Sequence, residues 1–198
     1  MRSPPDNVAV RLHLIRHTAP QIDSDVCYGQ ADIAVSHTDC IRLAASMYPR
    51  WQGRIPVYSS PLQRCHQLAV LLHERPVTDA RLMEMSFGEW ELRSWSAIPR
   101  VDVEAWAQNV AHYCPGGGES LLQMVGRVDS FLRELLRTAQ QTGQDEAVLV
   151  CHGGVIRVIL AWNAALSHTE LAQLVSTRQV TLDFGSCHEI SLTANALI

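Results

Sequence analysis

VAVRLHLI, residues 8–15, is the first apolar run of the chain, and Arg16-His17 follows it directly. Its length and composition are typical of a buried strand. A second run of this kind, Ala147-Val148-Leu149-Val150-Cys151, leads into His152-Gly153-Gly154. In open α/β sheets, ligands bind beyond the carboxyl ends of the strands. The two runs therefore predict an α/β sheet that carries one arginine and two histidines to the same edge.

A third strand and the helix after it add a second arginine. The strand is predicted at Val57-Tyr58-Ser59. Ser60 is predicted as the N-cap, Pro61 as the first helical residue and Gln63 as the far partner of a capping box. Arg64 then lies in the first helical turn, where the helix dipole favours an anion. Such a site suits a phosphoryl group, because guanidinium forks match phosphate oxygens in pairs.

Strand and helix patterns alternate through most of the chain. A long helix is predicted after Ser120, which caps it together with Gln123. Two short strands, at residues 180–184 and 187–192, flank a tight turn at Gly185-Ser186. The other predicted elements are helices over residues 36–47, 61–73, 154–165 and 170–175 and a short strand near Val77. This order predicts a three-layer α/β/α sandwich with a mostly parallel mixed sheet.

Length and charge exclude several classes of protein. The chain has 198 residues, 47% of them hydrophobic, so we expect residues 1–198 to form a single domain around one core. A formal net charge of −4 gives no basic footprint for nucleic acid. No apolar stretch approaches the roughly 20 residues that span a membrane, and residues 1–7 lack the apolar core of a signal peptide.

The cysteines agree with this picture. There are six, without paired C-x2-C spacing, which indicates free thiols in a reducing compartment. We therefore expect a cytoplasmic protein that binds a small molecule and neither nucleic acid nor membrane. The sequence leaves a homodimer open.

Residues 90–118 break the alternation and are predicted to form a lid over the edge that carries the histidines. The segment holds Trp90, Trp95 and Trp106 together with Tyr113. Their faces could stack on a flat apolar leaving group such as a benzimidazole base. The alternative is that the tryptophans only pack the insertion onto the sheet.

Four motifs stand in order along the chain: Leu14-Ile15-Arg16-His17-Thr18, Ser59-Ser60-Pro61-Leu62-Gln63-Arg64, Leu82-Met83-Glu84-Met85-Ser86-Phe87-Gly88-Glu89-Trp90-Glu91 and Val150-Cys151-His152-Gly153-Gly154. Together they resemble the histidine phosphatases, also called the phosphoglycerate mutase-like superfamily. Residues 27–32 and 115–120, Cys27-Tyr28-Gly29-Gln30-Ala31-Asp32 and Pro115-Gly116-Gly117-Gly118-Glu119-Ser120, are similar to segments of its bacterial branch that includes the α-ribazole phosphatases of cobamide synthesis. The resemblance implies a phosphoglycerate mutase-like fold and a phosphatase that forms a phosphohistidine. It implies neither a metal site nor a cofactor.

The resemblance also implies catalytic roles. His17 is the nucleophile, held in one tautomer by a backbone carbonyl on the far ring nitrogen. Glu84 protonates the leaving group and later activates water, with Glu89 and Glu91 as nearby competitors. His152 stabilises the developing charge and is expected to serve best when protonated.

The predicted phosphate-binding residues are Arg16, Thr18, Arg64, His152 and Gly153. Two positions depart from the family pattern. Thr18 stands where the family most often has glycine, and Asp23 lies near a position where asparagine is common. Thr18 and Gln30 are expected to compensate.

α-Ribazole 5′-phosphate is the leading substrate prediction, with Gln30, Trp90 and Trp95 as substrate contacts. Three alternatives stay open. A phosphoglycerate mutase-type phosphotransferase would let an alcohol intercept the phosphohistidine in place of water. A broad-specificity phosphatase and a non-catalytic module that binds phosphorylated ligands are the others.

A cysteine-phosphatase loop is a rival interpretation of the last motif. The stretch from Cys151 to Arg157 satisfies the C-x5-R pattern, which also follows a buried strand and opens a helix. Cys151 would then be a thiolate nucleophile and Arg157 the phosphate clamp. This interpretation leaves Arg16-His17 and Glu84 unexplained, so we favour the histidine mechanism.

Overall fold

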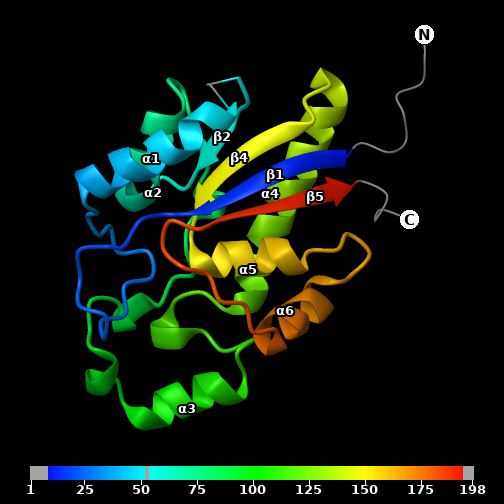
Figure 1. The fold of residues 1–198 in the computed structure, drawn as a ribbon. Coiled ribbons are helices and arrows are strands. Elements are labelled where there is room, and N and C mark those ends of the chain that lie inside the picture. The colour runs from blue at the N-terminus through cyan, green and yellow to red at the C-terminus, as the bar shows by residue number, and fades with distance from the viewer. Residues whose placement is uncertain (1–8, 52–53, 194–198) are drawn as a thin grey trace.

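The computed structural model of the protein describes residues 9–51 and 54–193, and Figure 1 shows its fold. The sheet has five strands in the order β3-β2-β4-β1-β5. Their bounds are β1 Ala9–Arg16, β2 Val57–Ser59, β3 Val77–Thr78, β4 Glu146–Cys151 and β5 Cys187–Thr193. Neighbouring strands are parallel except β5, which runs antiparallel to β1 at the edge. The prediction of a mostly parallel mixed sheet is confirmed.

Helices cover both faces of the sheet (Figure 1). The first face carries two and the second three: α1 His37–Trp51 and α2 Gln63–Leu72, then α4 Leu121–Thr142, α5 Gly153–Ala161 and α6 His168–Thr177. Side chains of β1 alternate between two cores, since Leu12 and Leu14 belong to the cluster of α4 and α5 and Ile15 to that of α1 and α2. This arrangement is the predicted α/β/α sandwich.

Short elements gather below the sheet in Figure 1, in the region of the predicted lid. They are α3 Arg100–Gln108 and three 3-10 turns, at Gly88–Trp90, Trp95–Ala97 and Pro115–Gly117. Trp90 and Ile98 form a small core there with Cys27, which comes from the loop after β1. The insertion is therefore packed around its own apolar cluster and tied to the β1 edge.

The pairing of β1 with β4 brings the two histidine motifs together. Arg16 lies opposite Cys151 in the parallel register, so His17 and His152 follow the last paired residues. The His17 N–H donates to the Cys151 carbonyl at 3.2 Å. Because parallel strands end at a common edge, motifs far apart in sequence meet at this point.

The beginning of α2 differs from the prediction. The helix starts at Gln63 with Leu62 as N-cap, and Ser60 forms no capping box. The Gln63 N–H donates to Asp32 Oδ1 at 2.7 Å, and its side-chain amide donates to the Asp32 carbonyl at 2.8 Å. A carboxylate from a distant loop thus takes the place of the local cap. Arg64 still lies in the first turn, as predicted.

The strand predicted at residues 180–184 is absent. The strand β5 pairs with β1 on one side only, and residues 180–184 do not add to its other side. The carbonyls of the segment instead accept hydrogen bonds from arginines: Leu182 from Arg16 Nη1, and Val180 from Arg157 Nη2 at 3.4 Å. The predicted turn is present, with Gly185 at φ 74°, a conformation that favours glycine.

Other boundaries shift by a few residues. The capping box of Ser120 and Gln123 is present at the start of α4, as predicted. A second capping box, formed by Ser167 and Glu170, starts α6 earlier than predicted. The helix α5 ends earlier than predicted, and Trp162, its C-cap, donates its indole N–H to Asp129 at 2.8 Å.

None of the helices in the described part of the chain is long and apolar enough to cross a membrane. All six cysteines lie in the described residues and are thiols that form no disulfide, as predicted. Residues 1–8, on which the expectation of no signal peptide rests, lie outside the described residues.

Candidate active site

His17 lies at the end of β1 and is only 1% exposed. Its Nδ1 lies 2.7 Å from the Thr18 carbonyl oxygen, which can only accept, so Nδ1 carries the proton and Nε2 keeps a lone pair. Burial, helped by the charges of Arg64 and Arg16, lowers the pKa of His17 to about 3. The ring is therefore neutral near pH 7 and has a nucleophilic nitrogen available.

His152 stands edge-on to His17, with 5.1 Å between ring centroids, and is fully buried. Arg64 Nε donates to His152 Nδ1 at 3.3 Å, so the proton of a neutral ring lies on Nε2, which is 2.8 Å from Ser60 Oγ. Burial, with the nearby His17 and Arg64 next in effect, lowers the pKa of His152 well below its usual value. Desolvation and the surrounding cations thus favour the neutral ring, so the protonated His152 that would serve best in charge stabilisation stays a prediction.

Arg64 is the largest fully buried side chain of the described residues. Its Nη1 donates to the Ala31 carbonyl at 2.7 Å and its Nη2 to the Gly29 carbonyl at 2.6 Å. With Nε on His152, the guanidinium is fixed from three sides. Residues 29–31 belong to a segment that the sequence linked only to the family branch. Their carbonyls orient Arg64, which is a predicted phosphate-binding residue.

Arg16 is held by the segment that precedes β5. Its Nη1 donates to the Leu182 carbonyl, and its guanidinium carbon lies 3.8 Å from the centre of the Phe184 ring. Its Nε is buried without a hydrogen-bond partner and faces Gly153, where an added Cβ would lie 3.5 Å from it. An unsatisfied buried donor costs about 1–3 kcal/mol, so an oxygen-rich ligand beside Gly153 would relieve it.

Glu84 reaches the N-terminal end of α5. Its Oε2 accepts the Gly154 N–H at 3.1 Å, and its Oε1 accepts the Met85 N–H at 3.0 Å. The carboxyl group is therefore anchored beside the second histidine motif by backbone donors. Of the three acidic candidates it alone has this position.

The other two carboxylates have different surroundings. Glu91 Oε1 accepts the N–H groups of Gln30 at 3.0 Å and Phe87 at 2.8 Å, which joins two loops of the site. Glu89 is exposed to solvent. Glu91 is thus a structural cross-link, and neither competes with Glu84 for the acid position.

Arg127, which sequence reasoning missed, holds the backbone of Glu84 and is itself held by Glu119. Arg127 Nη2 donates to the Glu84 carbonyl at 3.0 Å, and its Nη1 donates to the Arg81 carbonyl at 2.6 Å. Glu119 fixes Arg127 through two bonds of 2.6 and 2.8 Å. Gln30 Nε2 also donates to the Glu84 carbonyl, at 2.9 Å. Gln30 therefore helps to position Glu84, and its direct contact with substrate stays a prediction.

Thr18 and Gly153 lie beside the histidines in different ways. The Thr18 hydroxyl lies 3.4 Å from Cys40 Sγ on α1 and is directed to that layer, so its role in phosphate binding stays a prediction. What Thr18 supplies to the site is the carbonyl that fixes His17. Gly153 is the first residue of α5, where backbone N–H groups favour an anion.

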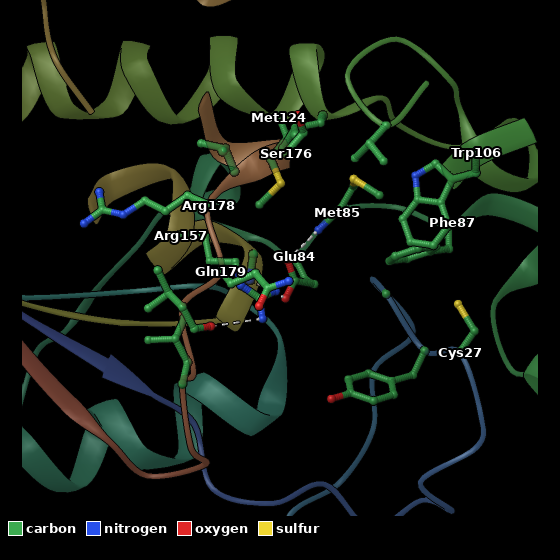
Figure 2. Close-up of a pocket in the computed structure, with 18 of the residues that line it drawn as sticks. Cys27, Glu84, Met85, Phe87, Trp106, Met124, Arg157, Ser176, Arg178 and Gln179 are labelled. Carbon is green, nitrogen blue, oxygen red and sulfur yellow. Dashed lines mark hydrogen bonds between the residues drawn. The ribbon is translucent and has the colours of Figure 1, made fainter. Parts of the chain in front are cut away.

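A cavity of about 990 Å³ opens next to this cluster, and Figure 2 shows Glu84 among its lining residues. Tyr28 and Gly154 also line it. His17 and His152 are buried and are not among the residues found to line the cavity. Of the three predicted catalytic residues, Glu84 is the one found at the cavity wall.

The aromatic residues of the insertion fall into two groups. Some line the cavity, and others pack in the core of the insertion. Trp95 and Trp106 line the cavity and stack on each other, with planes 7° apart and centroids 6.1 Å apart. Phe87 meets both edge-on. Trp90 is 4% exposed, belongs to the small core of the insertion and is not among the residues found to line the cavity, so the structure does not bring it together with Trp95 at the cavity wall.

Comparison with known proteins agrees with this geometry. A profile of the histidine phosphatase superfamily, branch 1, matches residues 12–193. The chain belongs to this superfamily. It is a phosphatase, a hydrolase of phosphoric monoesters, as the sequence resemblance predicted.

Relatives of this histidine phosphatase have several substrates. The adenosylcobalamin/α-ribazole phosphatase of Escherichia coli is 30% identical over 77% of this chain and 78% of its own. A Hydrogenobacter thermophilus protein, to which phosphoserine phosphatase activity is ascribed, is 27% identical over 92% of this chain and 99% of its own. The structure of a mycobacterial glucosyl-3-phosphoglycerate phosphatase superposes with a TM-score of 0.74, at 26% identity, over 92% of this chain and 90% of that one.

The rival cysteine mechanism finds no support in this histidine phosphatase. Cys151 is the last residue of β4, is fully buried and belongs to the apolar core. Burial raises the pKa of its thiol, which opposes formation of a thiolate. Arg157, the supposed clamp, lines the cavity and donates to the Val180 carbonyl.

The substitution Gly154→Ala is expected to displace the Glu84 carboxyl group, the predicted general acid, without unfolding this phosphatase. The added Cβ would lie 2.2 Å from Glu84 Oε1, the end of a flexible side chain that can shift. Because a misplacement of about 1 Å can cost on the order of 10²-fold in rate, we expect kcat for an alkyl phosphate to fall by about that factor. Steady-state kinetics, with the thermal unfolding midpoint as control, test this. A parental kcat in a folded variant would show that the position of Glu84 does not matter.

Proposed function

We propose that this phosphatase hydrolyses small phosphate monoesters through a phosphohistidine on His17. The observation that carries the proposal is the state of that ring, neutral and with its Nε2 lone pair free for attack. Attack by a side chain splits one difficult displacement into two easier ones. The unpartnered Nε of Arg16 and the N-terminus of α5 supply donors for the phosphoryl oxygens.

In the first half-reaction, His17 Nε2 forms a bond to phosphorus while the bond from phosphorus to the ester oxygen breaks. Arg16, Arg64 and His152 stabilise the negative charge on the remaining oxygens. The leaving alkoxide takes a proton from the Glu84 carboxyl group. The dianionic phosphoryl group would also favour the charged form of His152, which burial and the neighbouring cations disfavour.

In the second half-reaction, water attacks the phosphorus of the phosphohistidine. Glu84, now a carboxylate, takes a proton from that water as the new bond forms. The bond between Nε2 and phosphorus breaks, inorganic phosphate leaves, and His17 returns to its neutral form. One carboxyl group thus serves both steps and ends protonated, ready for the next ester.

α-Ribazole 5′-phosphate remains the leading substrate, and residues 90–118 are proposed to act as a lid that selects it. Two observations support this choice. The Escherichia coli relative is named for that reaction. The cavity wall of Phe87, Trp95 and Trp106 offers apolar faces to a flat base. A reaction in cobamide synthesis follows from the substrate.

The test is phosphate release from α-ribazole 5′-phosphate, phosphoserine and para-nitrophenyl phosphate, measured in the presence of a chelator. We expect turnover of all three, with the highest kcat/KM for the ribazole ester. Equal rates would favour a broad-specificity phosphatase. Binding of the esters without turnover would support a non-catalytic module, and transfer to an added alcohol with little free phosphate would support a mutase-type enzyme.

A further inference from the structure

The cavity beside Glu84 has two walls of different chemistry. Figure 2 shows Phe87 and Trp106 on one side and Arg157 and Arg178 on the other, with Glu84 between them. Glu84 is the proposed proton donor to the leaving alcohol. The alcohol part of a bound ester therefore extends from Glu84 into the space between the aromatic wall and the arginines.

Both arginines have donors available for a ligand. Arg157, on α5, donates to the Val180 carbonyl at 3.4 Å, and Arg178, the C-cap of α6, donates to the Leu160 carbonyl at 3.0 Å. Both side chains lie in exposed positions at the rim. Across residues 9–51 and 54–193, no carboxylate comes within the 4.0 Å of an ion pair with either guanidinium.

Arg133 and Arg81, by contrast, are neutralised by neighbouring acids. Arg133 on α4 makes two bonds of 3.0 and 2.8 Å to the carboxylate of Asp129. Arg81 is paired with Asp79 at 2.6 Å. The two cavity arginines differ from these because their charge is not balanced by a neighbouring acid.

The charge of the cavity is opposite to that of the whole protein. The chain carries a formal net charge of −4, yet the charged residues among those found to line the cavity are Glu84, Arg157 and Arg178. Two arginines and one glutamate leave the cavity lining with a positive formal charge even when Glu84 is ionised. The arginine wall therefore attracts negative charge, and its guanidinium groups match carboxylate or phosphate oxygens.

We infer that the cavity binds phosphate esters whose alcohol carries a second anionic group, a carboxylate or a second phosphate, and that Arg157 and Arg178 select it. The aromatic wall then holds the apolar part of the same alcohol. This inference rests on the proposed phosphomonoesterase function, but not on α-ribazole 5′-phosphate, whose alcohol has no such group. It adds a substrate class to the one proposed above.

The test uses phenyl phosphate, 4-carboxyphenyl phosphate and 1,4-phenylene bisphosphate as substrates. We expect kcat/KM to be about tenfold higher for the two esters with a second anion, the scale of one charge-assisted hydrogen bond. In the double variant Arg157→Gln with Arg178→Gln, this preference should fall to roughly twofold or less, because the charged donors are lost. The rate with phenyl phosphate should stay the same. The ranking of the two substrates that carry a second anionic group shows whether the site prefers a carboxylate or a phosphate.

Arg100→Gln is the matched control. Arg100 lies on α3 with its side chain 91% exposed and paired to Glu104, away from the cavity, so the variant should keep the full preference. If the parent protein hydrolyses all three esters at similar kcat/KM, or if the preference survives in the double variant, the inference is wrong.

Binding of two non-hydrolysable probes separates this inference from the proposed function. Calorimetry would compare phenylphosphonate with 4-carboxyphenylphosphonate on the parent and the double variant. A tighter complex with the carboxylated probe that depends on the two arginines supports the anion site even if no ester is hydrolysed, in which case the proposed function alone fails. Equal binding of the two probes by the parent overturns the inference, whatever the turnover.

Discussion

His17→Ala is expected to lower kcat/KM for every phosphate monoester by about 10³-fold or more, because removal of an enzymatic nucleophile leaves only binding and charge stabilisation. The structure supports so large an effect. Within the site, the His17 ring combines a fixed proton on Nδ1 with a free lone pair on Nε2. His152 cannot take its place, because both of its nitrogens bond to Arg64 and Ser60.

Rapid quenching of the parent enzyme with a radiolabelled ester should trap a phosphoprotein that is stable to alkali and labile to acid, as a phosphohistidine is. His17→Ala should give none. Cys151→Ala is the matched control, and it should form the phosphoprotein and turn over near the parental rate, because the Cys151 thiol is buried in the core with a raised pKa. Loss of activity in a folded Cys151→Ala, with activity kept in His17→Ala, would sink the histidine mechanism.

Glu84→Gln is expected to lower kcat for alkyl phosphates by about 10²- to 10⁴-fold, the usual range for loss of general acid and base catalysis. The amide keeps one acceptor for the backbone donors of Met85 and Gly154 but cannot release a proton in the same way. The effect should depend on the leaving group. Release of para-nitrophenolate needs no proton, so the first step should survive in the variant, whereas attack by water still lacks its base.

The variant should therefore show a burst with para-nitrophenyl phosphate. Stopped-flow absorbance would record rapid release of nitrophenolate, stoichiometric with the enzyme, followed by slow turnover and accumulation of phosphoprotein. Glu89→Gln is the control, since Glu89 is exposed, and it should behave like the parent. Equal loss of rate for alkyl and nitrophenyl esters without a burst would exclude Glu84 as the group that serves both steps.

The elements that form the sheet edge were predictable because their signals are local. In both β1 and β4, an apolar run followed by polar residues marks where the strand ends. Arg64 lies in the first turn of α2 whichever residue caps that helix. Errors arose where a distant residue replaced a local partner. Asp32 took over the capping of α2. Residues 180–184 formed no strand, and the carbonyls of Leu182 and Val180 accept hydrogen bonds from Arg16 and Arg157.

The sequence by itself determined the α/β fold and the residues that gather at one edge, because strand periodicity, helix starts and a shared motif order are properties of neighbouring residues. Only the tertiary structure decided how those residues are held and charged. The neutral state of His152, the support of Glu84 by Arg127 and Gln30, and the two walls of the cavity all depend on burial and on contacts between distant segments. Desolvation and hydrogen-bond geometry follow from three-dimensional packing, which spacing along the chain does not specify.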